Sequence, residues 1–438
     1  MTVLIFPLSR IEGHAQVSIE EVDGEVLSAR FQATELRGFE HFVQGIPADQ
    51  MPVIVPRICG VCATAHHVAS VKALEDIYGV VPPPLAHKLR ELLLLGQLIQ
   101  NQATSLFIFT MPDRMGMSSL FDDGATSDSS DTARTRIAMH ALRVRKSGTD
   151  LISAAGGQFI HPVKAVVGGM SGGIDAETAS QVRQQLIQAL PVACDLFDLY
   201  WEMSFELRER IGTWGDDQPA YYLAATGASY PTYDGDLLRV MGPDGMMRHS
   251  FQANEYNHYL TFHESESSYA GVSSWGGEVL RANSLARINL ARMMGTPQAD
   301  GYLTRFREAF GHPAHAILLF DLCRGIELVY AIERAIEMLD GPLDEGWAAV
   351  PHTPRDGEGY GLVEAPRGPL IHHYVIKDGL IAKAEFIIPT VHNMLAIERA
   401  LIVAAKRYIN SERVNLELDR AVGRVVRAFD PCISCATH

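Results

Sequence analysis

The chain is poor in positive charge. Its 438 residues include 37 lysines and arginines against 52 aspartates and glutamates, which gives a formal net charge of −15. This balance leaves no basic stripe for nucleic acid and nothing that would attract the chain to an anionic membrane surface. We therefore expect no nucleic-acid partner.

Long uncharged runs are also scarce, and one of them extends from Leu92 to Met111. Amides and hydroxyls within it, such as Gln100 and Ser105, would be costly in lipid, so we expect a buried helix and no membrane insertion. Residues Met1 to Pro7 contain no cationic segment followed by a long apolar core, so we expect no secretory signal.

Cysteine is rare, but four of the six cysteines form two Cys-x-x-Cys pairs at opposite ends of the chain. The pairs are Cys59 with Cys62 and Cys432 with Cys435. Four thiolates are a soft-metal ligand set, and the spacing lets both sulfurs of a pair bind one centre from a single turn. We therefore predict that the chain closes on itself around metal.

Disulfides, redox chemistry and structural zinc are the alternatives. A disulfide within a pair would close a very short ring, and a thioredoxin-like motif would account for only one pair. Zinc ribbons also use two pairs, but these lie tens of residues apart, whereas 369 residues lie between Cys62 and Cys432. Closing so long a loop costs only a logarithmic entropy term, so it is feasible, but it makes little sense as a local staple.

The sequence contains no repeats, linkers or low-complexity tracts. Hydrophobic residues make up 47% of the chain, enough for a large buried core. Because the two ends should meet at one site, we predict a single unit over residues 1–438 with interwoven subregions. These are an N-terminal β hairpin (about 1–56), a helical core (about 63–340), and a C-terminal β hairpin with helices (about 360–438).

Residue periodicity predicts a mainly helical α+β protein, a bundle of long helices with small peripheral sheets. Hairpins are expected for Gln16–Glu20 with Leu27–Phe31, around Asp23-Gly24, and for Leu370–Ile376 with Ile381–Ile388, around Lys377-Asp378-Gly379. Helices are expected at about Thr64–Tyr78, Leu85–Phe109, Ala133–Ala155, Ala176–Ile211, Arg281–Met294 and Ala314–Leu339, with two more reaching Phe429. Asp122–Asp131 is expected to form a solvated loop and Ala220–Phe251 irregular strands and turns.

Several blocks around the cysteines follow a known pattern. They are Arg10-Ile11-Glu12-Gly13-His14, Arg37-Gly38-Phe39-Glu40, Arg57-Ile58-Cys59-Gly60-Val61-Cys62 with His66, Glu364-Ala365-Pro366-Arg367-Gly368, Pro389-Thr390, and Asp430-Pro431-Cys432-x-x-Cys435-x-x-His438. In these blocks, which span the chain in family order, the sequence resembles the large, catalytic subunit of nickel–iron hydrogenases. The resemblance implies that family's fold and the reversible heterolytic cleavage of H2 to protons and electrons.

The resemblance implies nickel held by all four thiolates, with Cys62 and Cys435 also bridging to iron and Cys59 and Cys432 terminal on nickel. Soft thiolates favour nickel and iron over hard cations, and an open nickel position can hold hydrogen or hydride. In the family the iron carries carbon monoxide and cyanide, which no side chain supplies.

The same resemblance assigns catalytic roles to Arg367, Glu12, Cys432 and Asp430. Arg367 would hang over the open metal position, where its permanent charge polarises hydrogen or helps a base take the proton, although a lone Arg on a strand usually faces solvent. Glu12, just before the first expected strand, would take a proton passed from Cys432, although such a Glu is more often a surface carboxylate. Asp430, otherwise a turn former before proline, would pair near Arg367, as would Asp113.

Other matched residues would surround the centre. His66 lies one helical turn after Cys62 and would hydrogen-bond the cysteine sulfur, where a capping or core histidine is the plain alternative. The Pro389-Thr390 pair, beside Pro366, would supply the backbone and hydroxyl donors to iron-bound cyanide, although Thr in a strand is otherwise ordinary.

A structural magnesium, or an iron in its place, is implied near the end of the chain. Its protein ligands would be Glu40, the main-chain oxygen of Phe386 and His438. Magnesium keeps several waters and needs few carboxylates, so this ligand set is chemically tolerable.

The chain departs from many relatives at Gln100-Asn101-Gln102 and at His392-Asn393. These changes and the modest length favour the soluble, cytoplasmic branch. Cys194 and Cys323 stand alone and are expected to be core residues, so this chain holds no iron–sulfur cluster. Electrons would therefore leave through an obligate iron–sulfur small subunit, and then, where present, through diaphorase-type subunits that carry the nicotinamide site.

Three other functions share part of this pattern. A quinone-binding relative of complex I would have lost the paired cysteines, and a zinc-stabilised structural protein would need no Glu-Ala-Pro-Arg-Gly block. A hydrogen-sensing regulatory homologue would keep every ligand and differ only in turnover. Metal content distinguishes the zinc protein from a hydrogenase, and a turnover assay distinguishes the hydrogen sensor from a catalytic subunit.

Overall fold

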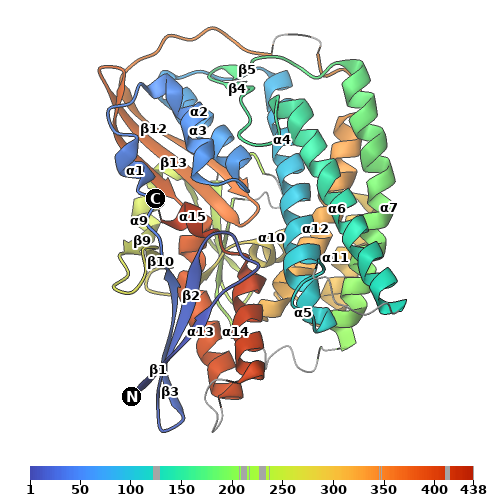
Figure 1. Cartoon of the computed structure of the whole chain (residues 1–438). Helices are drawn as coiled ribbons and strands as arrows, with labels where there is room; N and C mark the ends of the chain where they lie inside the picture. The colour runs from blue at the N-terminus through green and yellow to red at the C-terminus, as the bar shows by residue number, and fades with distance from the viewer. Residues whose placement is uncertain are drawn as a thin grey trace.

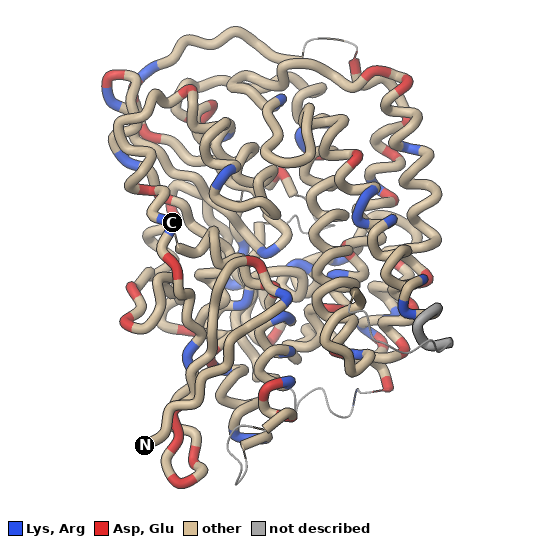
Figure 2. Tube along the Cα trace, viewed as in Figure 1, with Lys and Arg blue, Asp and Glu red and all other residues tan. Residues whose placement is uncertain are grey.

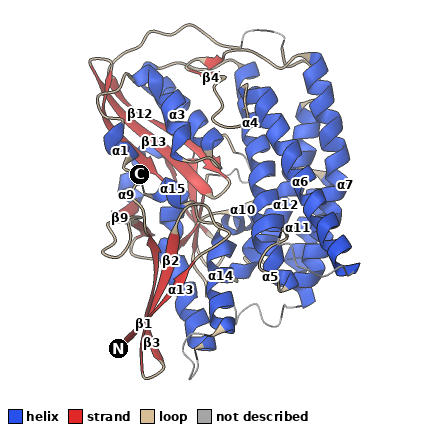
Figure 3. Ribbon diagram, viewed as in Figure 1, coloured by secondary structure: helices blue, strands red, loops and turns tan. Residues whose placement is uncertain are grey.

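The computed structural model of the chain describes residues 1–121, 129–206, 208, 215–216, 218–225, 233–235, 237–344, 346, 348–409 and 415–437, with only the backbone described at 129–132. Long helices stand side by side on one flank of the molecule, and small sheets with short helices form the other (Figure 1, Figure 3). This arrangement confirms the expected α+β fold with a helical bundle.

The helices are α1 (Phe39–Phe42), α2 (Met51–Ile54), α3 (Ala63–Tyr78), α4 (Pro84–Ala103), α5 (Met111–Met115), α6 (Ser129–Gly156), α7 (Ala176–Glu206), α9 (Tyr256–Tyr259), α10 (Ser284–Leu290), α11 (Pro297–Phe310), α12 (Phe320–Met338), α13 (Pro389–Tyr408), α14 (Leu416–Phe429) and α15 (Ile433–Ala436). The strands form sheets β1-β2-β3 (Thr2–Pro7, Ala15–Val22, Glu25–Ala33), β4-β5 (Ala165–Val166, Gly169–Met170), β11-β6-β7-β8 (Leu280–Arg281, Tyr221–Ala224, Leu237–Met241, Met247–Gln252), β10-β9 (Val272–Trp275, Leu260–His263) and β12-β13-β14 (Gly357–Ala365, Gly368–Lys377, Leu380–Ile387).

Glycines allow the bundle helices to approach closely. A Cβ on Gly148 of α6 would lie 2.7 Å from the carbonyl oxygen of Gly96 on α4, and a Cβ on Gly325 of α12 would lie 1.9 Å from the Phe197 ring on α7. Because real Cβ atoms cannot come so near, both crossings require glycine despite its cost inside a helix.

The uncharged run forms a core helix. Among the described residues, Pro84–Met115 is the helical stretch long and apolar enough to cross a bilayer, and 83% of its apolar window is buried inside the protein. The expected helix to Phe109 is not α-helical throughout, because residues Thr104–Thr110 form a π-helical segment. Both threonines turn their hydroxyls back to carbonyls four residues earlier, at 2.7 and 3.0 Å, which competes with regular α-helical pairing.

The N-terminal hairpin is confirmed as β2 and β3. Asp23 and Gly24 both have positive φ, 52° and 86°, as a tight hairpin turn requires. An additional strand, β1, pairs antiparallel with β2. Glu12 therefore lies between β1 and β2, and the expectation that it precedes the first strand was wrong.

The C-terminal hairpin is confirmed as β13 and β14, but the third strand, β12, was not predicted from the sequence. Gly357, Gly359 and Gly361 alternate along one face of β12, and a Cβ on Gly361 would lie 1.9 Å from the carbonyl oxygen of Ala69 on α3. Alternating glycine weakens a strand signal in sequence, yet here it lets α3 lie directly on the sheet.

Three other expectations changed in the bundle. The predicted loop Asp122–Asp131 lies mostly outside the described residues, but α6 already begins at Ser129. The helix expected over Arg281–Met294 is only α10, and α11, which follows Gly295, was missed. Helix α10 already ends at Leu290, and α11 begins after Gly295-Thr296, since Pro297 is favourable in the first helical turn.

The C-terminal segment contacts residues from the first forty positions of the chain. The backbone N–H groups of Arg37 and Gly38 donate to the carbonyl of Thr437 at 2.7 and 3.1 Å, and Glu12 forms a parallel bridge with Cys432. Figure 1 shows the end of the chain beside α1. These contacts bring the N-terminal and C-terminal segments that contain the two cysteine pairs together.

Candidate metal centre

The four paired cysteines form one buried cluster. Cys62 lies immediately before the first residue of α3, and Cys432 occupies the same position before α15, which contains Cys435. Among the described residues their sulfurs form the group that could hold a metal ion, with all four within 4.8 Å of one another. Cys59 and Cys432 lie 3.3 Å apart, so the predicted meeting of the two pairs is present.

The cluster needs a cation to carry four charges. Hydrogen bonds from the neighbouring thiols, that of Cys432 first, lower the pKa of Cys59. Burial raises the pKa of the other three thiols. Four thiolates in this low-dielectric site would repel one another, and a soft divalent metal is the partner that their chemistry fits. All six cysteines are free thiols, so no disulfide competes for them.

A cavity of about 20 Å³ adjoins one side of the cluster. Its lining residues are Cys62, His66, Ala365, Pro366, Arg367, Leu370, Ile388, Pro389, Thr390, Cys432 and Cys435. Cys59 is not among them. The space is large enough for one or two groups the size of water, so small ligands of a metal fit there.

Arg367 does not lie on a strand, as its sequence context suggested, but in the two-residue turn that joins β12 to β13. Its Nε donates to the main-chain oxygen of Asp430 at 2.5 Å and its Nη2 to the Asp430 carboxylate at 3.1 Å. Its Nη1 is buried without a protein hydrogen-bond partner. Because Arg367 also lines the cavity, a donor remains for a ligand there.

Asp430 is held from three directions. Its backbone adopts the left-handed conformation (φ 48°) immediately after α14. Asn101 donates to the second carboxylate oxygen at 3.1 Å, and Asn283 holds the preceding carbonyl, that of Phe429, at 2.8 Å. Asn101, one of the departures from many relatives, therefore supports the Arg367–Asp430 pair directly.

Arg287 supports the same turn, and sequence reasoning missed it. Its guanidinium donates to the carbonyls of Ala365 and Pro366 at 3.1 and 2.7 Å and to Glu364 and Glu327. It is fully buried, as are Arg281 and Arg324. Figure 2 marks the lysine and arginine positions along the Cα trace in blue, several of them on segments in the middle of the molecule. The buried Glu364 carboxylate within the motif signalled a cationic partner, but not which one.

Glu12 touches the cluster. Its carboxylate accepts from the Cys432 sulfur at 3.2 Å and from the backbone and hydroxyl of Ser434 at 3.0 and 2.6 Å. Burial raises the pKa of Glu12, and the negative charge of Cys59 adds to the effect. A carboxylate with a raised pKa beside a sulfur accepts a proton more readily than an ordinary carboxylate does.

Gly13 allows this contact. Its φ is +81°, and a Cβ there would lie 2.7 Å from the Cβ of Ile433. Since an L side chain would push the loop away from α15, glycine brings the Glu12 carboxylate to the cysteine pair.

His66 and Thr390 lie beside the cluster, with two differences from expectation. His66 Nε2 contacts the sulfur of Cys435 at 3.3 Å, although His66 follows Cys62 in sequence. Thr390 lies in the first turn of α13, not in a strand, directly after Pro389. Its hydroxyl accepts from the backbone N–H of Cys432 at 3.0 Å.

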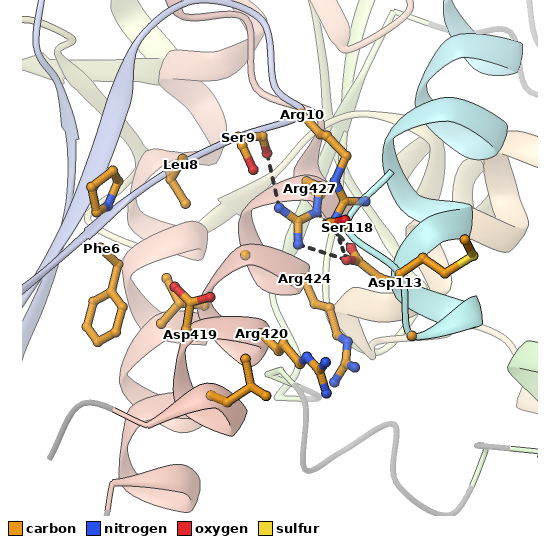
Figure 4. Close-up of a pocket in the computed structure, with 16 residues that line it drawn as sticks. Phe6, Leu8, Ser9, Arg10, Asp113, Ser118, Asp419, Arg420, Arg424 and Arg427 are labelled. Atoms are coloured by element: carbon orange, nitrogen blue, oxygen red, sulfur yellow. Dashed lines mark hydrogen bonds and ion pairs between the residues drawn. The ribbon is translucent and has the colours of Figure 1, made fainter. Parts of the chain in front are cut away.

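Asp113 does not pair near Arg367, so that expectation was wrong. Its carboxylate receives Arg10 at 2.6 Å and Arg427 at 2.7 and 3.0 Å. These groups line a separate pocket of about 260 Å³ between the end of β1, α5 and α14 (Figure 4). The ion-pair partners of Asp113 among the described residues are thus Arg10 and Arg427.

The expected magnesium ligands are partly placed. The backbone N–H of Phe386 donates to the Glu40 carboxylate at 2.6 Å, so these two residues are neighbours. His438 lies outside the described residues. The Thr437 carbonyl contacts Gly38 at the start of α1, which also contains Glu40.

The two remaining cysteines are not part of the cluster. Cys323 is fully buried in α12, as expected of a core residue, and Cys194 is only partly buried and donates to Gln298 at 3.1 Å. His392 and Asn393, the other departures, are buried in α13 and bond Ser273 and the backbone of Ala282.

Comparison with known proteins is consistent with this geometry. The family model described as nickel-dependent hydrogenase matches residues 37–113 and 238–438, and a model described as HoxL-like matches residues 2–36. One of the subunits of the F420-non-reducing hydrogenase vhu of Methanococcus voltae is 35% identical, over 92% of this chain and 98% of that protein. The NAD-reducing hydrogenase HoxS subunit beta of Cupriavidus necator is 29% identical, over 100% of this chain and 94% of that protein.

Solved structures match over the full length. A crystal structure of an NAD+-reducing NiFe hydrogenase in the H2-reduced state has a TM-score of 0.92 at 30% identity and covers 100% of both chains. The Ni-Fe-Se hydrogenase from D. vulgaris Hildenborough has a TM-score of 0.81 at 20% identity, again covering 100% of both chains, and shares the fold.

Proposed function

This chain belongs to the nickel-dependent hydrogenase family and is a hydrogenase catalytic subunit, and we propose that its own residues hold a nickel–iron centre and move the proton released from H2. One observation carries the proposal: four buried thiolates from opposite ends of the chain meet beside a small cavity that Arg367 lines, and Glu12 contacts one of them. When bound, the metals supply the open coordination position at which hydrogen is split reversibly.

Nickel would be held by all four sulfurs. By the resemblance, the thiolates of Cys62 and Cys435 would also hold iron, and both line the cavity, as Cys432 does. Carbon monoxide and cyanide would be ligands of that iron, and the same cavity adjoins both of these sulfurs. Pro366, Pro389, Thr390 and His66 line it, which supports their roles around these small ligands.

Arg367, Asp430 and Glu12 would handle the proton. The cationic Arg367, held by Asp430 at two points, leaves one buried donor beside the cavity, where it can orient hydrogen or stabilise a developing negative charge. Cys432 can pass a proton to Glu12 over 3.2 Å, and the Ser434 hydroxyl at 2.6 Å orients the receiving carboxylate.

A second metal, magnesium or iron, would bind near the chain end through Glu40, the carbonyl of Phe386 and His438. The contact of Glu40 with Phe386 supports this placement, as does the docking of Thr437 beside α1. The ion would tie the C-terminal segment that contains Cys432 and Cys435 to the N-terminal body.

Electrons would leave through an iron–sulfur small subunit, because the described residues of this chain offer no cysteine group besides the nickel–iron ligands. Relatives are named as subunits of F420-non-reducing and NAD-reducing hydrogenases, so diaphorase-type subunits are candidate further partners. We place the complex in the cytoplasm.

Purification of the chain with its co-purifying subunits tests the proposal. We expect nickel and iron in the complex and hydrogen-dependent reduction of a viologen dye. Cys59→Ser should lose nickel and turnover, whereas Cys194→Ser, a matched control away from the cluster, should keep both. Zinc alone in the wild-type complex, or unchanged turnover in Cys59→Ser, would refute the assignment; metal without turnover would point to a sensor.

A further inference from the structure

A line of hydrogen bonds leaves the cluster at Cys435, whereas Glu12 contacts Cys432. His66 Nε2 lies 3.3 Å from the Cys435 sulfur, and His66 Nδ1 lies 2.9 Å from Nε2 of His372. His372 Nδ1 lies 2.6 Å from the hydroxyl of Tyr374, which lies 3.0 Å from the Ser70 hydroxyl. The line therefore connects α15, α3 and strand β13.

The line follows from two periodicities. Cys62, His66 and Ser70 recur every four residues and share one face of α3, while His372 and Tyr374 are two residues apart on one face of β13. Helix and strand come close enough for these contacts because β12 presents glycines to α3. The four polar residues of the line are at most 1% exposed.

Burial restricts the protons along the line. A neutral imidazole carries one N–H, so if His66 donates from Nε2 to the sulfur, its Nδ1 must accept from His372 Nε2. His372 Nδ1 must then accept as well, and the Tyr374 hydroxyl is its donor. Burial raises the pKa of Tyr374 far above its ordinary value, so this hydroxyl keeps its proton. Because the Tyr374 hydroxyl has a single proton, donation to His372 leaves its oxygen to accept from Ser70, whose hydroxyl can rotate to donate over the same 3.0 Å.

We propose that Ser70, Tyr374 and His372 are positioning residues that fix His66 in the tautomer whose Nε2–H points at the Cys435 sulfur. This proposal rests on the proposed function only in that Cys435 is a metal ligand. A fixed donor on this sulfur withdraws electron density from it, and thereby from the metals it holds.

The role of the line differs from simple core packing. A buried polar network that merely filled space would leave the sulfur's electron density unaffected when its far end changed. A positioning line transmits the change, because loss of the Tyr374 donor lets His372 and then His66 adopt the other tautomer.

Infrared spectroscopy of the purified complex tests whether a change at Tyr374 or Ser70 alters the electron density at the metals that Cys435 holds. In Tyr374→Phe we expect the stretching bands of the carbon monoxide and cyanide on iron to shift to lower frequency, with nickel and iron content unchanged. Ser70→Ala should shift them less in the same direction. Tyr360→Phe is the matched control, since Tyr360 lies in the same sheet but its hydroxyl bonds Glu358 away from the cluster, and its bands should match wild type.

Bands unchanged in both Tyr374→Phe and Ser70→Ala would overturn the proposal, as would an equal shift in Tyr360→Phe. Should Tyr374→Phe fail to fold, histidine-selective ¹⁵N NMR of the wild-type complex decides, with His66→Gln used for assignment. We expect a protonated Nε2 on both His66 and His372; a protonated Nδ1 on His66 would contradict the assignment. Absence of nickel and of hydrogen-dependent dye reduction in wild type would instead refute the proposed function, and the NMR result would still decide the tautomer.

Discussion

Glu12 is the residue through which the cluster can exchange protons with the rest of the protein. Its carboxylate contacts the Cys432 sulfur and is not a metal ligand, so Glu12→Gln should keep the metals and the fold. We expect hydrogen–deuterium exchange catalysed by the complex to fall roughly 10²–10⁴-fold, since the amide cannot take up a proton. Gas-phase mass spectrometry measures the exchange and metal analysis provides the control. Wild-type exchange with full metal content would remove Glu12 from the route.

Arg367 combines a fixed geometry with a permanent charge. Lysine cannot reproduce the two contacts with Asp430 and still present a third donor to the cavity. We expect Arg367→Lys to slow hydrogen-dependent dye reduction by about 10²–10³-fold at unchanged nickel content. Arg420→Lys, on the exposed face of α14, is the control and should be as active as wild type. Equal rates in the two variants would contradict the role of Arg367.

His67 should make the stability of the protein depend on pH. It is fully buried, donates from Nδ1 to the Pro52 carbonyl and accepts at Nε2 from the backbone of Ala165. Burial lowers the pKa of His67 to about 4. The unfolded state, with a pKa near 6.5, then binds more protons between pH 6.5 and 4, so stability falls as pH falls through this window, by roughly 3 kcal/mol at most from this residue.

Denaturant unfolding of the wild-type chain and of His67→Gln across this window measures the effect. Glutamine can keep one donor and one acceptor without titrating, so we expect a smaller loss of stability on acidification in the variant. Parallel pH profiles for the two proteins would show that His67 does not contribute.

At the level of secondary structure, the site depends on how closely α3 lies on the C-terminal sheet. A Cβ on Gly361 would meet the Ala69 carbonyl at 1.9 Å, so Gly361→Ala must push α3, with Cys62 and His66, away from β13. We expect a loss of several kcal/mol in unfolding free energy, of the order seen for overpacked or strained cores.

Gly301→Ala is the matched control. Gly301 lies in α11 with open space around its Cβ position, so the substitution should stabilise the protein by up to about 1 kcal/mol. Thermal unfolding compares the two variants, and a stable, fully metallated Gly361→Ala would contradict the close-packing argument.

Some helices and strands could be predicted from the sequence and others could not. Strongly periodic segments such as α3 and the two hairpins were predicted, because each carries its own pattern of apolar residues or turn glycine. Strand β12 was missed because its alternating glycines have a low strand propensity; their role is to let α3 pack closely on the sheet. Arg287 and His372 were missed as parts of the site because their partners lie on elements that only the tertiary fold brings together.

For the molecule as a whole, the meeting of the two cysteine pairs was the prediction that the sequence supported most directly. The chemistry of four thiolates demanded a shared centre regardless of the intervening sequence, and the structure places all four sulfurs within 4.8 Å. The Glu12 contact with Cys432 and the Arg367 contact with Asp430 followed from matched motifs. The pairing of Asp113 did not, because its partners are Arg10 and Arg427.

X-ray absorption at the nickel edge of the purified wild-type complex tests the central claim most directly. We predict nickel surrounded by sulfur, with an iron neighbour and one coordination position not filled by protein. A complex without nickel, whose four sulfurs saturate a single tetrahedral zinc ion, would contradict a hydrogen-splitting centre in this chain.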